Sequence, residues 1–417
     1  MRVLLLNQCF HPDVVSTAQH LTDLAVALAE RGHSVTVVAS RRGYDDPSIR
    51  FPAREEWRGV TIIRIPSLAL GKKTKLRRAL GFASFLFNCT LRLAILPKFD
   101  VVVALTSPPL ISLLGALFVR LKGGRFVFWV MDLNPDEALA AGWLREQSAA
   151  ARILGSMLRY SLRHAERIVA LDRFMVRRIL DKGIPEEKLV VIPPWSHDDA
   201  VQYDPEGRQS FRARHGLSKK FVVMYSGNHS PCHPLNTLLQ AAEQLAAHPA
   251  IVFCFVGGGS EFNKVRGFAQ EKRLGNIICL PYQPLDQLAA SLSSADLHVV
   301  VMGEPFVGII HPCKIYNILA IGLSYLIIGP LESHLSDIVR ETRADGRART
   351  VAHGQTEILV KHLRELAEVE ITATGPKQSP IAARFSKAAQ LPRMLETIES
   401  AAARADGQPI QTSGESA

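Results

Sequence analysis

The sequence lacks the marks of several common protein classes. Its 417 residues contain six scattered cysteines and no Cys-x-x-Cys pair, which excludes a disulfide-rich scaffold and is typical of reduced thiols in the cytosol. No Gly-x-Gly-x-x-Gly motif follows the first apolar segment, which disfavours NAD binding. Met1-Arg2 leads directly into the apolar segment Val3–Leu6 without the regions of a signal peptide. We therefore expect a cytoplasmic protein.

Acidic residues are missing from one long stretch, between Glu56 and Asp100. Residues 1–200 carry 28 Lys and Arg against 19 Asp and Glu, whereas the rest of the chain is nearly neutral. Five basic residues lie together in the acid-free stretch, directly before the apolar segment Ala79–Leu96; they are Lys72, Lys73, Lys75, Arg77 and Arg78. A basic cluster joined to an apolar helix favours docking on an anionic membrane surface.

We therefore expect Lys72–Leu96 to hold the protein on the inner face of the cytoplasmic membrane. Polar residues such as Asn88 and Arg92 within the apolar segment argue against a membrane-spanning helix. The alternative is a solvated basic turn followed by an ordinary core helix. Nucleic-acid binding is disfavoured, because the positive charge adjoins an apolar helix rather than exposed aromatic residues.

Apolar strand candidates alternate with helical patterns along nearly the whole chain. They are near-continuous Val, Ile and Leu runs, such as 100–105 and 297–302, which indicates parallel strands covered on both faces. A Pro-rich and charged passage at 193–220 interrupts this alternation of strands and helices, which resumes after it. The pattern predicts an α/β protein with two tandem doubly wound, Rossmann-like domains and a ligand site between them.

The predicted organisation has four parts. An N-terminal domain spans 1–200, a C-terminal domain spans 201–380, a C-terminal helix at 381–403 packs back, and 404–417 form a disordered tail.

The segment Ala295–Gly322 is the most informative part of the chain. It predicts a buried strand, a loop ending in Gly308-Ile309-Ile310-His311, and a helix entered through Pro312. A helix N-terminus directs free N–H groups and partial positive charge at whatever lies before it, which suits a phosphate. Lys314 adds a full charge. The alternative is an ordinary connection between a strand and a helix.

Two carboxylates follow another buried strand, in the segment Phe128–Gly142. Asp132 lies at the ligand-facing end of that strand, where a carboxylate can hold a hydroxyl group or take up its proton. Asp136 fits the role of N-cap for the following helix better.

Several segments resemble retaining glycosyltransferases of the GT-B fold, family GT4, in its WbuB-like, colanic-acid-type subgroup. The segment FWVMDLNPDE (128–137) is similar to the W-x-x-D-L-x-P-[DE] motif of that subgroup. A second motif, P-[SC]-K-x-Y-x-x-L-A-x-G, is matched by Pro312, Cys313, Lys314, Tyr316, Leu319, Ala320 and Gly322. The resemblance covers roughly residues 1–400.

The resemblance implies a sugar-nucleotide site in the C-terminal domain. Asp132 and Lys314 are the implied catalytic residues. In this interpretation Gly308, Ile309, Ile310 and the helix N-terminus hold the diphosphate, His311 lines that pocket, and Asn317 faces the ribose. The resemblance implies further donor contacts at three places in the second domain. They are the end of its first strand with the following loop (Gly227, Asn228 and His233), its glycine turn (Gly257) and the loop that holds the nucleobase (Tyr282).

The chain departs from the family pattern at two places. Asn228 and His233 stand where the family has the Arg and Lys that clamp the diphosphate, so Lys314 would supply most of the charge. The paired acids of the family's E-x7-E motif are replaced by Ile309 and Asn317. A zinc site made of His229, Cys232, His233, His311 and Cys313 is a weak alternative, because the spacing fits no standard module.

The implied reaction transfers a sugar with retention from a nucleoside-diphosphate sugar, most simply a UDP-sugar, to an acceptor on a polyprenyl diphosphate. Neither a metal nor a cofactor is expected, because the helix dipole and Lys314 neutralise the leaving group. Surface-polysaccharide or O-antigen synthesis is the natural setting. Two alternatives remain open: a sugar-nucleotide 2-epimerase of the same fold, and a non-catalytic subunit that binds a sugar nucleotide or lipid carrier.

Overall fold

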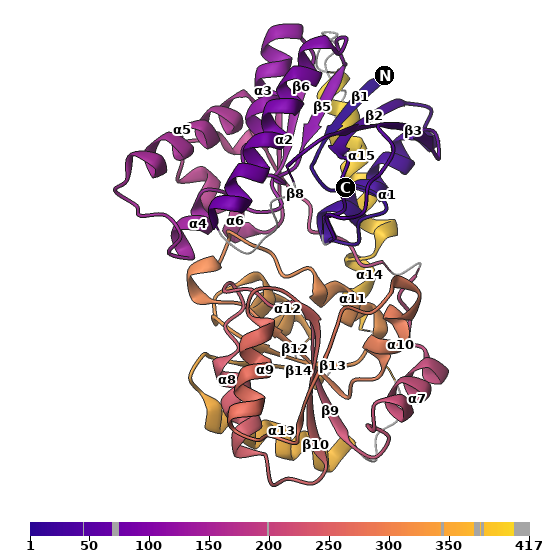
Figure 1. Ribbon diagram of the computed structural model, residues 1–417, viewed down its shortest axis with the longest axis vertical. Coiled ribbons are helices and arrows are strands. Elements are labelled where there is room, and N and C mark those ends of the chain that lie inside the picture. The colour runs from indigo at the N-terminus through magenta and orange to yellow at the C-terminus, as the bar shows by residue number, and fades with distance from the viewer. Residues whose placement is uncertain are drawn as a thin grey trace, which may run out of the picture.

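The computed structural model describes residues 1–44, 46–68, 75–197, 200–342, 346–370, 376 and 379–403. They form two α/β domains stacked along the long axis of the molecule (Figure 1). The predicted tail at 404–417 and the basic residues Lys72 and Lys73 lie outside the described residues, as does the side chain of Lys75.

The N-terminal domain is built on an eight-stranded sheet in the order β3-β4-β2-β1-β5-β6-β7-β8. All neighbours are parallel except β3 and β4, which pair in antiparallel fashion. Its strands are β1 (Arg2–Leu6), β2 (Ser34–Ser40), β3 (Arg54–Trp57), β4 (Val60–Ile65), β5 (Val101–Ala104), β6 (Arg125–Trp129), β7 (Arg167–Ala170) and β8 (Leu189–Val191).

The C-terminal domain has a six-stranded, fully parallel sheet in the order β11-β10-β9-β12-β13-β14. This is the doubly wound order 3-2-1-4-5-6, and β9 and β12 flank its switch point. The strands are β9 (Phe221–Asn228), β10 (Ile251–Gly258), β11 (Ile277–Leu280), β12 (Leu297–Val301), β13 (Ser324–Ile328) and β14 (Ala348–Val351). The predicted fold class, two doubly wound domains, is confirmed.

Helices cover both faces of each sheet (Figure 1). The N-terminal domain holds α1 (Ser16–Glu30), α2 (Lys75–Ile95), α3 (Ile111–Lys122), α4 (Asp136–Ala140), α5 (Ala149–His164) and α6 (Arg173–Leu180). The C-terminal domain holds α7 (Pro205–Arg214), α8 (Asn236–Gln244), α9 (Phe262–Glu271), α10 (Leu288–Ser293), α11 (Lys314–Ile321), α12 (His334–Thr342), α13 (Thr356–Glu370) and α14 (Pro380–Arg384).

The last helix, α15 (Lys387–Ala403), returns to the N-terminal domain. Its apolar face enters the core of that domain through residues such as Met394 and Ile398. At its start, Lys387 Nζ lies 2.7 Å from Asp23 Oδ1 on α1, and the other oxygen of Asp23 accepts a hydrogen bond of 2.8 Å from the Trp195 indole. The chain therefore crosses between the domains twice, near residues 196 and 386.

The passage at 193–220, expected to be an irregular break, contains the helix α7. Asp204 caps its N-terminus by accepting a hydrogen bond of 2.8 Å from the Gly207 amide, and Pro205 occupies the first turn. Asp followed by Pro is a standard helix start. The polar composition of the passage hid this signal.

Buried neutral histidines give the fold a predictable pH dependence. Burial, the largest cause in each case, lowers the pKa of His20 and His298 to about 4 and that of His334 to about 3. Below pH 6.5 the unfolded chain therefore binds protons that the folded chain does not. Each such residue reduces the free energy of unfolding by about 1.4 kcal/mol per pH unit until its folded pKa is reached.

We predict that stability falls steeply between pH 6.5 and 4.5 and that His298→Gln reduces this loss. His298 lies on β12, and its Nε2 pairs with the Leu292 carbonyl at 2.9 Å. In urea titrations at pH 7.5 and 5.5, the variant should lose about 1 kcal/mol less than the wild type between the two pH values. The exposed His164→Gln variant is the control. Equal pH dependence of wild type and His298→Gln would contradict the prediction.

Candidate functional site

The candidate site lies at the switch point of the C-terminal sheet. β9 ends in Gly227-Asn228, and the segment after β12 leads into α11, whose first residue is Lys314. A Cβ atom added at Gly227 would lie 3.1 Å from Lys314 Nζ, so only glycine lets the ammonium group approach the strand end this closely. Ligands of open α/β sheets bind at this position.

Lys314 carries a buried cation without a counter-ion. Its Nζ is buried and has no hydrogen-bond partner among the residues that the structure describes. The nitrogen lies 3.7 Å from the centre of the Tyr225 ring, a cation–π contact. Burial lowers the Lys314 pKa to about 7. An anion entering this position would meet an ammonium group that no other group neutralises.

Two predicted site histidines surround Lys314 in neutral form. The pKa of His233 falls to about 3 and that of His229 to about 4, in both cases through burial and then through the charge of Lys314. His233 Nδ1 pairs with the Val301 carbonyl at 2.8 Å, whereas His229 Nε2 is buried without a partner among the described residues. His229 therefore offers a second polar atom to a ligand beside Lys314.

A glycine turn and an aromatic side chain border this pocket. Gly257 pairs with Gly227 across the sheet, and a Cβ atom there would lie 3.3 Å from the Tyr282 ring. Tyr282 is 48% exposed and lies flat enough against Gly258 that a Cβ atom there would also touch its ring. The structure thus brings Gly227, Gly257, Tyr282 and Lys314 together at one edge of the sheet, with the exposed Asn228 beside them.

The predicted diphosphate loop has a different role. The amides of Ile309 and Ile310 already donate to the Phe306 carbonyl, at 3.0 and 3.2 Å. Both side chains are buried in the core cluster of the N-terminal domain. Gly308 has φ +70°, and a Cβ atom there would come within 2.6 Å of the Phe174 backbone on α6. The amides of Ile309 and Ile310 thus already have an acceptor in this structure, and the loop joins the two domains.

The helix start is also corrected. Pro312 precedes the helix, Cys313 is its N-cap, and α11 begins at Lys314. Lys314 is therefore the first residue of the helix, which was expected to be entered through Pro312.

His311 and Asn317 are likewise committed elsewhere. His311 Nδ1 pairs with Asp172 Oδ2 at 2.9 Å, and its Nε2 contacts the Tyr316 hydroxyl. Asn317 Oδ1 accepts a hydrogen bond of 3.0 Å from the amide of His197, in the linker between the domains. In this structure both His311 ring nitrogens and Asn317 Oδ1 therefore serve the domain junction rather than an open pocket.

Asp172, His311 and His334 form a buried cluster across that junction. The His311 and His334 rings stack with centroids 3.8 Å apart and planes within 15°. Burial alone would raise the Asp172 pKa, but the hydrogen bond from His311 and the nearby histidines outweigh it and hold that pKa well below its usual range.

This cluster is also the one described group of ligand-type residues close enough to share a metal. The Nδ1 atoms of His311 and His334 lie 2.9 and 3.4 Å from the same oxygen, Asp172 Oδ2. The five residues of the alternative zinc site do not form such a group among the described residues, and His311 turns to Asp172 instead.

Across the junction from Lys314, the N-terminal domain presents a carboxylate pair. Asp132 follows β6, and its amide donates to Thr106 Oγ1 at 3.3 Å. Burial and then the charge of Glu137 raise the Asp132 pKa to about 7. Glu137 Oε2 accepts from the Asn134 amide at 3.0 Å. Charge coupling of Asp132 with Cys232 and Cys313 shows that the pair faces the C-terminal domain.

Asp136, the other predicted carboxylate, is structural but not as a cap. It is the first residue of α4, whose N-cap Pro135 has no side-chain cap bond, and its Oδ1 lies 2.6 Å from Lys182 Nζ.

Sequence reasoning missed Glu137 and Tyr225. Glu137 lies in the same motif as Asp132, five residues further on, and α4 is too short for periodicity to show which of its acids turns inward. Tyr225 lies inside an apolar strand and looks like a core residue until Lys314 is placed on its ring.

Two models of known families match the chain, one for each domain. The "Glycosyl transferase 4-like domain" matches residues 17–195, and "Glycosyl transferases group 1" matches residues 207–307. The boundary between the two matches falls in the linker that precedes α7.

Two curated relatives support the same assignment. The chain is 24% identical over 399 residues to a protein of Escherichia coli (strain K12) named as the colanic acid biosynthesis glycosyl transferase WcaI, covering 93% of this chain and 96% of the relative. It is 25% identical over 294 residues to the glycosyltransferase WbjE of Pseudomonas aeruginosa, covering 70% of this chain and 72% of the relative.

Solved structures share the fold over nearly the whole chain. HepE of Anabaena, solved in complex with UDP and glucose, has a TM-score of 0.71 at 15% identity, covering 96% of this chain and all of that one. WaaG, a glycosyltransferase involved in lipopolysaccharide biosynthesis, has a TM-score of 0.65 at 15% identity, covering 97% of this chain and 95% of that one. Taken with the two matched domains and the named relatives, this protein is a glycosyltransferase with the GT-B fold.

Proposed function

We propose that the protein transfers a sugar, with retention, from a UDP-sugar to a glycan acceptor on a polyprenyl diphosphate, in the synthesis of a bacterial surface polysaccharide such as an O-antigen. The observation that carries the proposal is the buried, unpaired Lys314 Nζ at the switch point of the C-terminal domain. The name of WcaI, a glycosyl transferase of colanic acid biosynthesis, supports the setting, and HepE, solved with UDP-glucose, supports the donor class.

The leaving group accounts for the position of Lys314. When the bond between the anomeric carbon and the diphosphate oxygen breaks, the electron pair stays on that oxygen and negative charge grows there. A diphosphate seated between Gly227 and the start of α11 places this charge beside the ammonium group and the positive end of the helix. A buried cation does this better than an exposed one, because water does not screen it. The proposal therefore needs neither a metal nor another cofactor.

The acceptor side belongs to the N-terminal domain. Asp132, with a pKa raised to about 7, can hold a hydroxyl of the acceptor or donor sugar and exchange a proton with it near neutral pH. The charge of Glu137 beside it adds to burial in raising the Asp132 pKa, as expected when a second carboxylate is close. No protein nucleophile is required, because the proposed retention follows from attack on the face that the diphosphate leaves.

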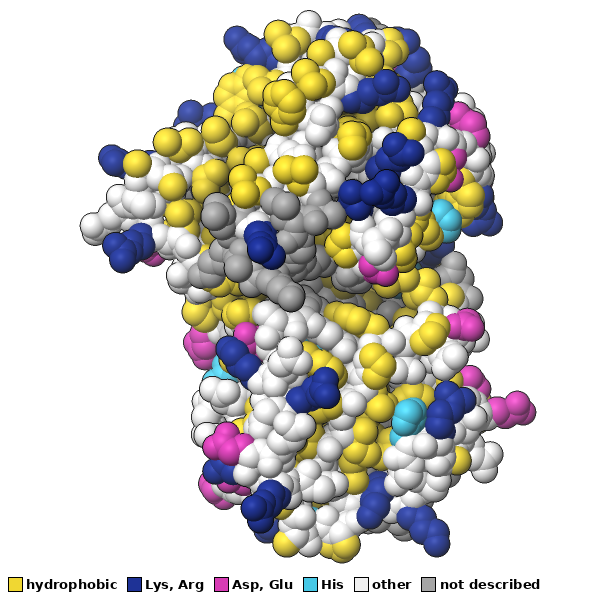
Figure 2. Space-filling view, viewed as in Figure 1, with side chains coloured by type: hydrophobic (Ala, Val, Ile, Leu, Met, Phe, Trp, Pro, Cys, Tyr) yellow, Lys and Arg dark blue, Asp and Glu magenta, His cyan; other side chains and the backbone are white. Residues whose placement is uncertain are grey.

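One side of the N-terminal domain is suited to an anionic membrane. α2, α3 and α5 carry nine Lys and Arg and no acidic residue. α2 packs on the domain through Phe85 and Cys89, both fully buried, while Phe87 and Ile95 on its other face are 65% and 71% exposed. Figure 2 shows apolar side chains gathered over this part of the domain with basic residues among them.

Arg77–Ile95 is the one described helix long and apolar enough to cross a membrane by length and composition, and it is 17% buried. Its packed inner face favours lying on the surface instead. We propose that this side docks on the inner face of the cytoplasmic membrane, where the lipid-linked acceptor resides, through the predicted segment Lys72–Leu96.

The first prediction concerns proton uptake by Lys314. UDP should raise the Lys314 pKa from about 7, so binding at pH 7.5 should take up a proton. Titration calorimetry in two buffers of different ionisation enthalpy measures this uptake. Lys314→Met should abolish the part of the proton uptake that Lys314 contributes. It should also weaken UDP binding about 10- to 100-fold, because a hydrogen bond to a charged group is lost.

Lys264→Met, an exposed lysine on α9 of the same domain, is the control and should behave as the wild type. Unchanged UDP affinity in Lys314→Met would remove the basis of the proposal.

The second prediction concerns the carboxylate pair. Asp132→Asn should reduce kcat about 100-fold or more, the usual contribution of acid–base catalysis. Glu137→Gln removes one charge that raises the Asp132 pKa, so the Asp132 titration should shift to lower pH yet stay above 3.8 because burial remains. Carboxyl carbon NMR and the pH dependence of UDP release measure both effects.

Asp136→Asn, which breaks only the ion pair with Lys182, should leave the Asp132 titration in place. An unchanged pH profile in Glu137→Gln would show that the two carboxylates do not interact.

The third prediction concerns the membrane. Co-sedimentation with vesicles containing phosphatidylglycerol should exceed that with pure phosphatidylcholine and should fall with salt. The variants Arg77→Ser/Arg78→Ser and Phe87→Ser/Leu91→Ser should each reduce binding several-fold. Leu331→Ser, an equally exposed leucine on the other domain, is the control. Equal binding to both vesicle types would contradict electrostatic docking.

A further inference from the structure

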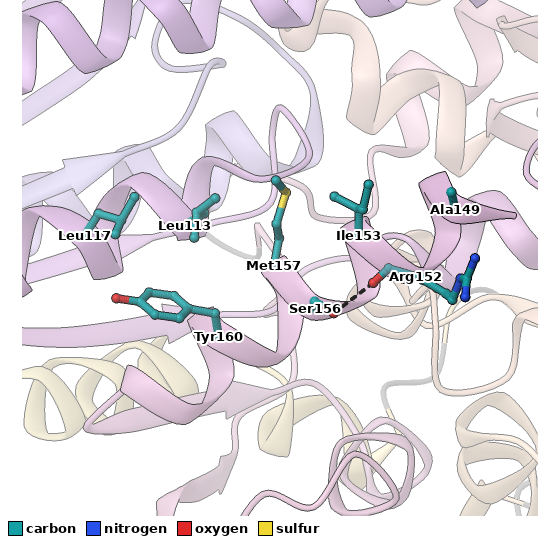
Figure 3. Close-up of a pocket in the computed structure, with 8 residues that line it drawn as sticks. All are labelled: Leu113, Leu117, Ala149, Arg152, Ile153, Ser156, Met157 and Tyr160. Carbon is teal, nitrogen blue, oxygen red and sulfur yellow. Dashed lines mark hydrogen bonds between the residues drawn. The ribbon is translucent and has the colours of Figure 1, made fainter.

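An apolar groove runs along the outer surface of the N-terminal domain, between α3 and α5. Its volume is about 650 Å³, within the range of small-molecule sites. Figure 3 shows the side chains of the two helices facing it. They are Leu113 and Leu117 from α3, and Ala149, Arg152, Ile153, Ser156, Met157 and Tyr160 from α5.

The walls of the groove offer apolar contact and little else. The Ser156 hydroxyl is used internally, since it donates to the Arg152 carbonyl at 2.9 Å and accepts from Arg159 at 3.0 Å. Leu117 and Ile153 remain 37% and 55% exposed. Exposed aliphatic side chains lining a concave surface indicate a binding site rather than a core defect. A sugar or a nucleotide would find too few polar partners here.

The groove is directional. α3 follows β5 and α5 follows the loop after β6, so both helices begin at the carboxyl edge of the sheet, where Asp132 lies. Arg152 lies in the first turn of α5, at this end of the groove, and its guanidinium forms no hydrogen bond or ion pair with the residues that the structure describes. Tyr160 lies two turns further along. A ligand in the groove thus has a cationic end near the junction and an apolar end away from it.

The surroundings favour a lipid chain with an anionic head. Neither α3 nor α5 carries an acid, and neighbouring α2 carries none either. Leu117 and Ile153 in the groove are themselves exposed to solvent. A hydrocarbon chain can therefore pass from a bilayer into the groove while its head meets Arg152.

We propose that this groove binds the isoprenoid chain of the acceptor lipid, with Arg152 contacting its diphosphate. The groove thereby sets how far the acceptor sugar reaches toward Asp132. This inference rests on the proposed function for the identity of the lipid, but the groove can be tested without any donor.

Farnesyl diphosphate is the probe, because it carries a short isoprenoid chain and the same head group. Titration calorimetry with the full chain should show binding that Leu117→Asp and Ile153→Asp each weaken at least tenfold. The matched control is Leu121→Asp, which places the same charge on the same helix outside the groove and should change the affinity less than twofold. Arg152→Ala should weaken farnesyl diphosphate binding but not that of farnesol.

Two results would overturn the inference. Equal losses in Leu117→Asp and Leu121→Asp would mean that the apolar surface as a whole, rather than the groove, takes up the chain. Complete displacement of the probe by inorganic pyrophosphate, with Leu117→Asp and Ile153→Asp unaffected, would mean that only the head group is bound. UDP binding, measured on the same variants, separates the groove proposal from the proposed function. If the wild type does not bind UDP, the donor assignment fails, but the farnesyl diphosphate results still test the groove.

Discussion

The structure depends on one costly feature, a lysine ammonium group buried without a counter-ion. Lys314 Nζ is confined between the Tyr225 ring and the end of β9, and desolvation brings its pKa to about 7. The residues around Lys314 accommodate its buried ammonium group. Gly227 leaves the space that a side chain would fill, and His229 and His233 stay neutral partly because Lys314 is near. Such an arrangement costs stability in the free protein and is repaid when an anion binds.

The same segment joins the two domains. In the loop between β12 and Lys314, the amides of Ile309 and Ile310 donate to the Phe306 carbonyl, and both isoleucine side chains pack in the N-terminal core. His311 in the same loop pairs with Asp172. Gly308, six positions before Lys314, lies against the Phe174 backbone on α6. The proposed donor site and the contact between the domains therefore share one short stretch of backbone, and the proposed acceptor-side carboxylates, Asp132 and Glu137, lie across the junction.

The N-terminal domain has two functional sides for a simple topological reason. In a parallel sheet all strands end at one edge, so the loops carrying Asp132 and Glu137 gather there, at the junction with the other domain. The helices return along the faces, and α2, α3 and α5 share one outer surface, where their basic and apolar residues accumulate (Figure 1). Catalysis and lipid contact can thus coexist in one domain, with the N-termini of α3 and α5 connecting them.

The sequence by itself determined the alternation of strands and helices and the class of chemistry. Long Val, Ile and Leu runs alternating with helices require parallel strands covered on both faces, and this pattern predicted most strands of both sheets. It missed β3 and β14, short edge strands of mixed polarity, and α7, whose signal lay in one Asp-Pro pair. Lys314 could be found because a lysine at the start of a helix after a buried strand has a physical meaning in any protein of this architecture.

Tertiary structure decided which polar residues are free to bind a ligand. Pattern alone placed His311, Asn317 and the amides of Ile309 and Ile310 in the donor site, yet His311 and Asn317 bond residues distant in sequence and the two amides close a local turn. Tertiary structure also decided that Glu137 rather than Asp136 stands beside Asp132, because Lys182, just after α6, pairs with Asp136. Hydrogen-bond capacity is shared across the whole fold, and a sequence shows which groups exist without showing which are already satisfied.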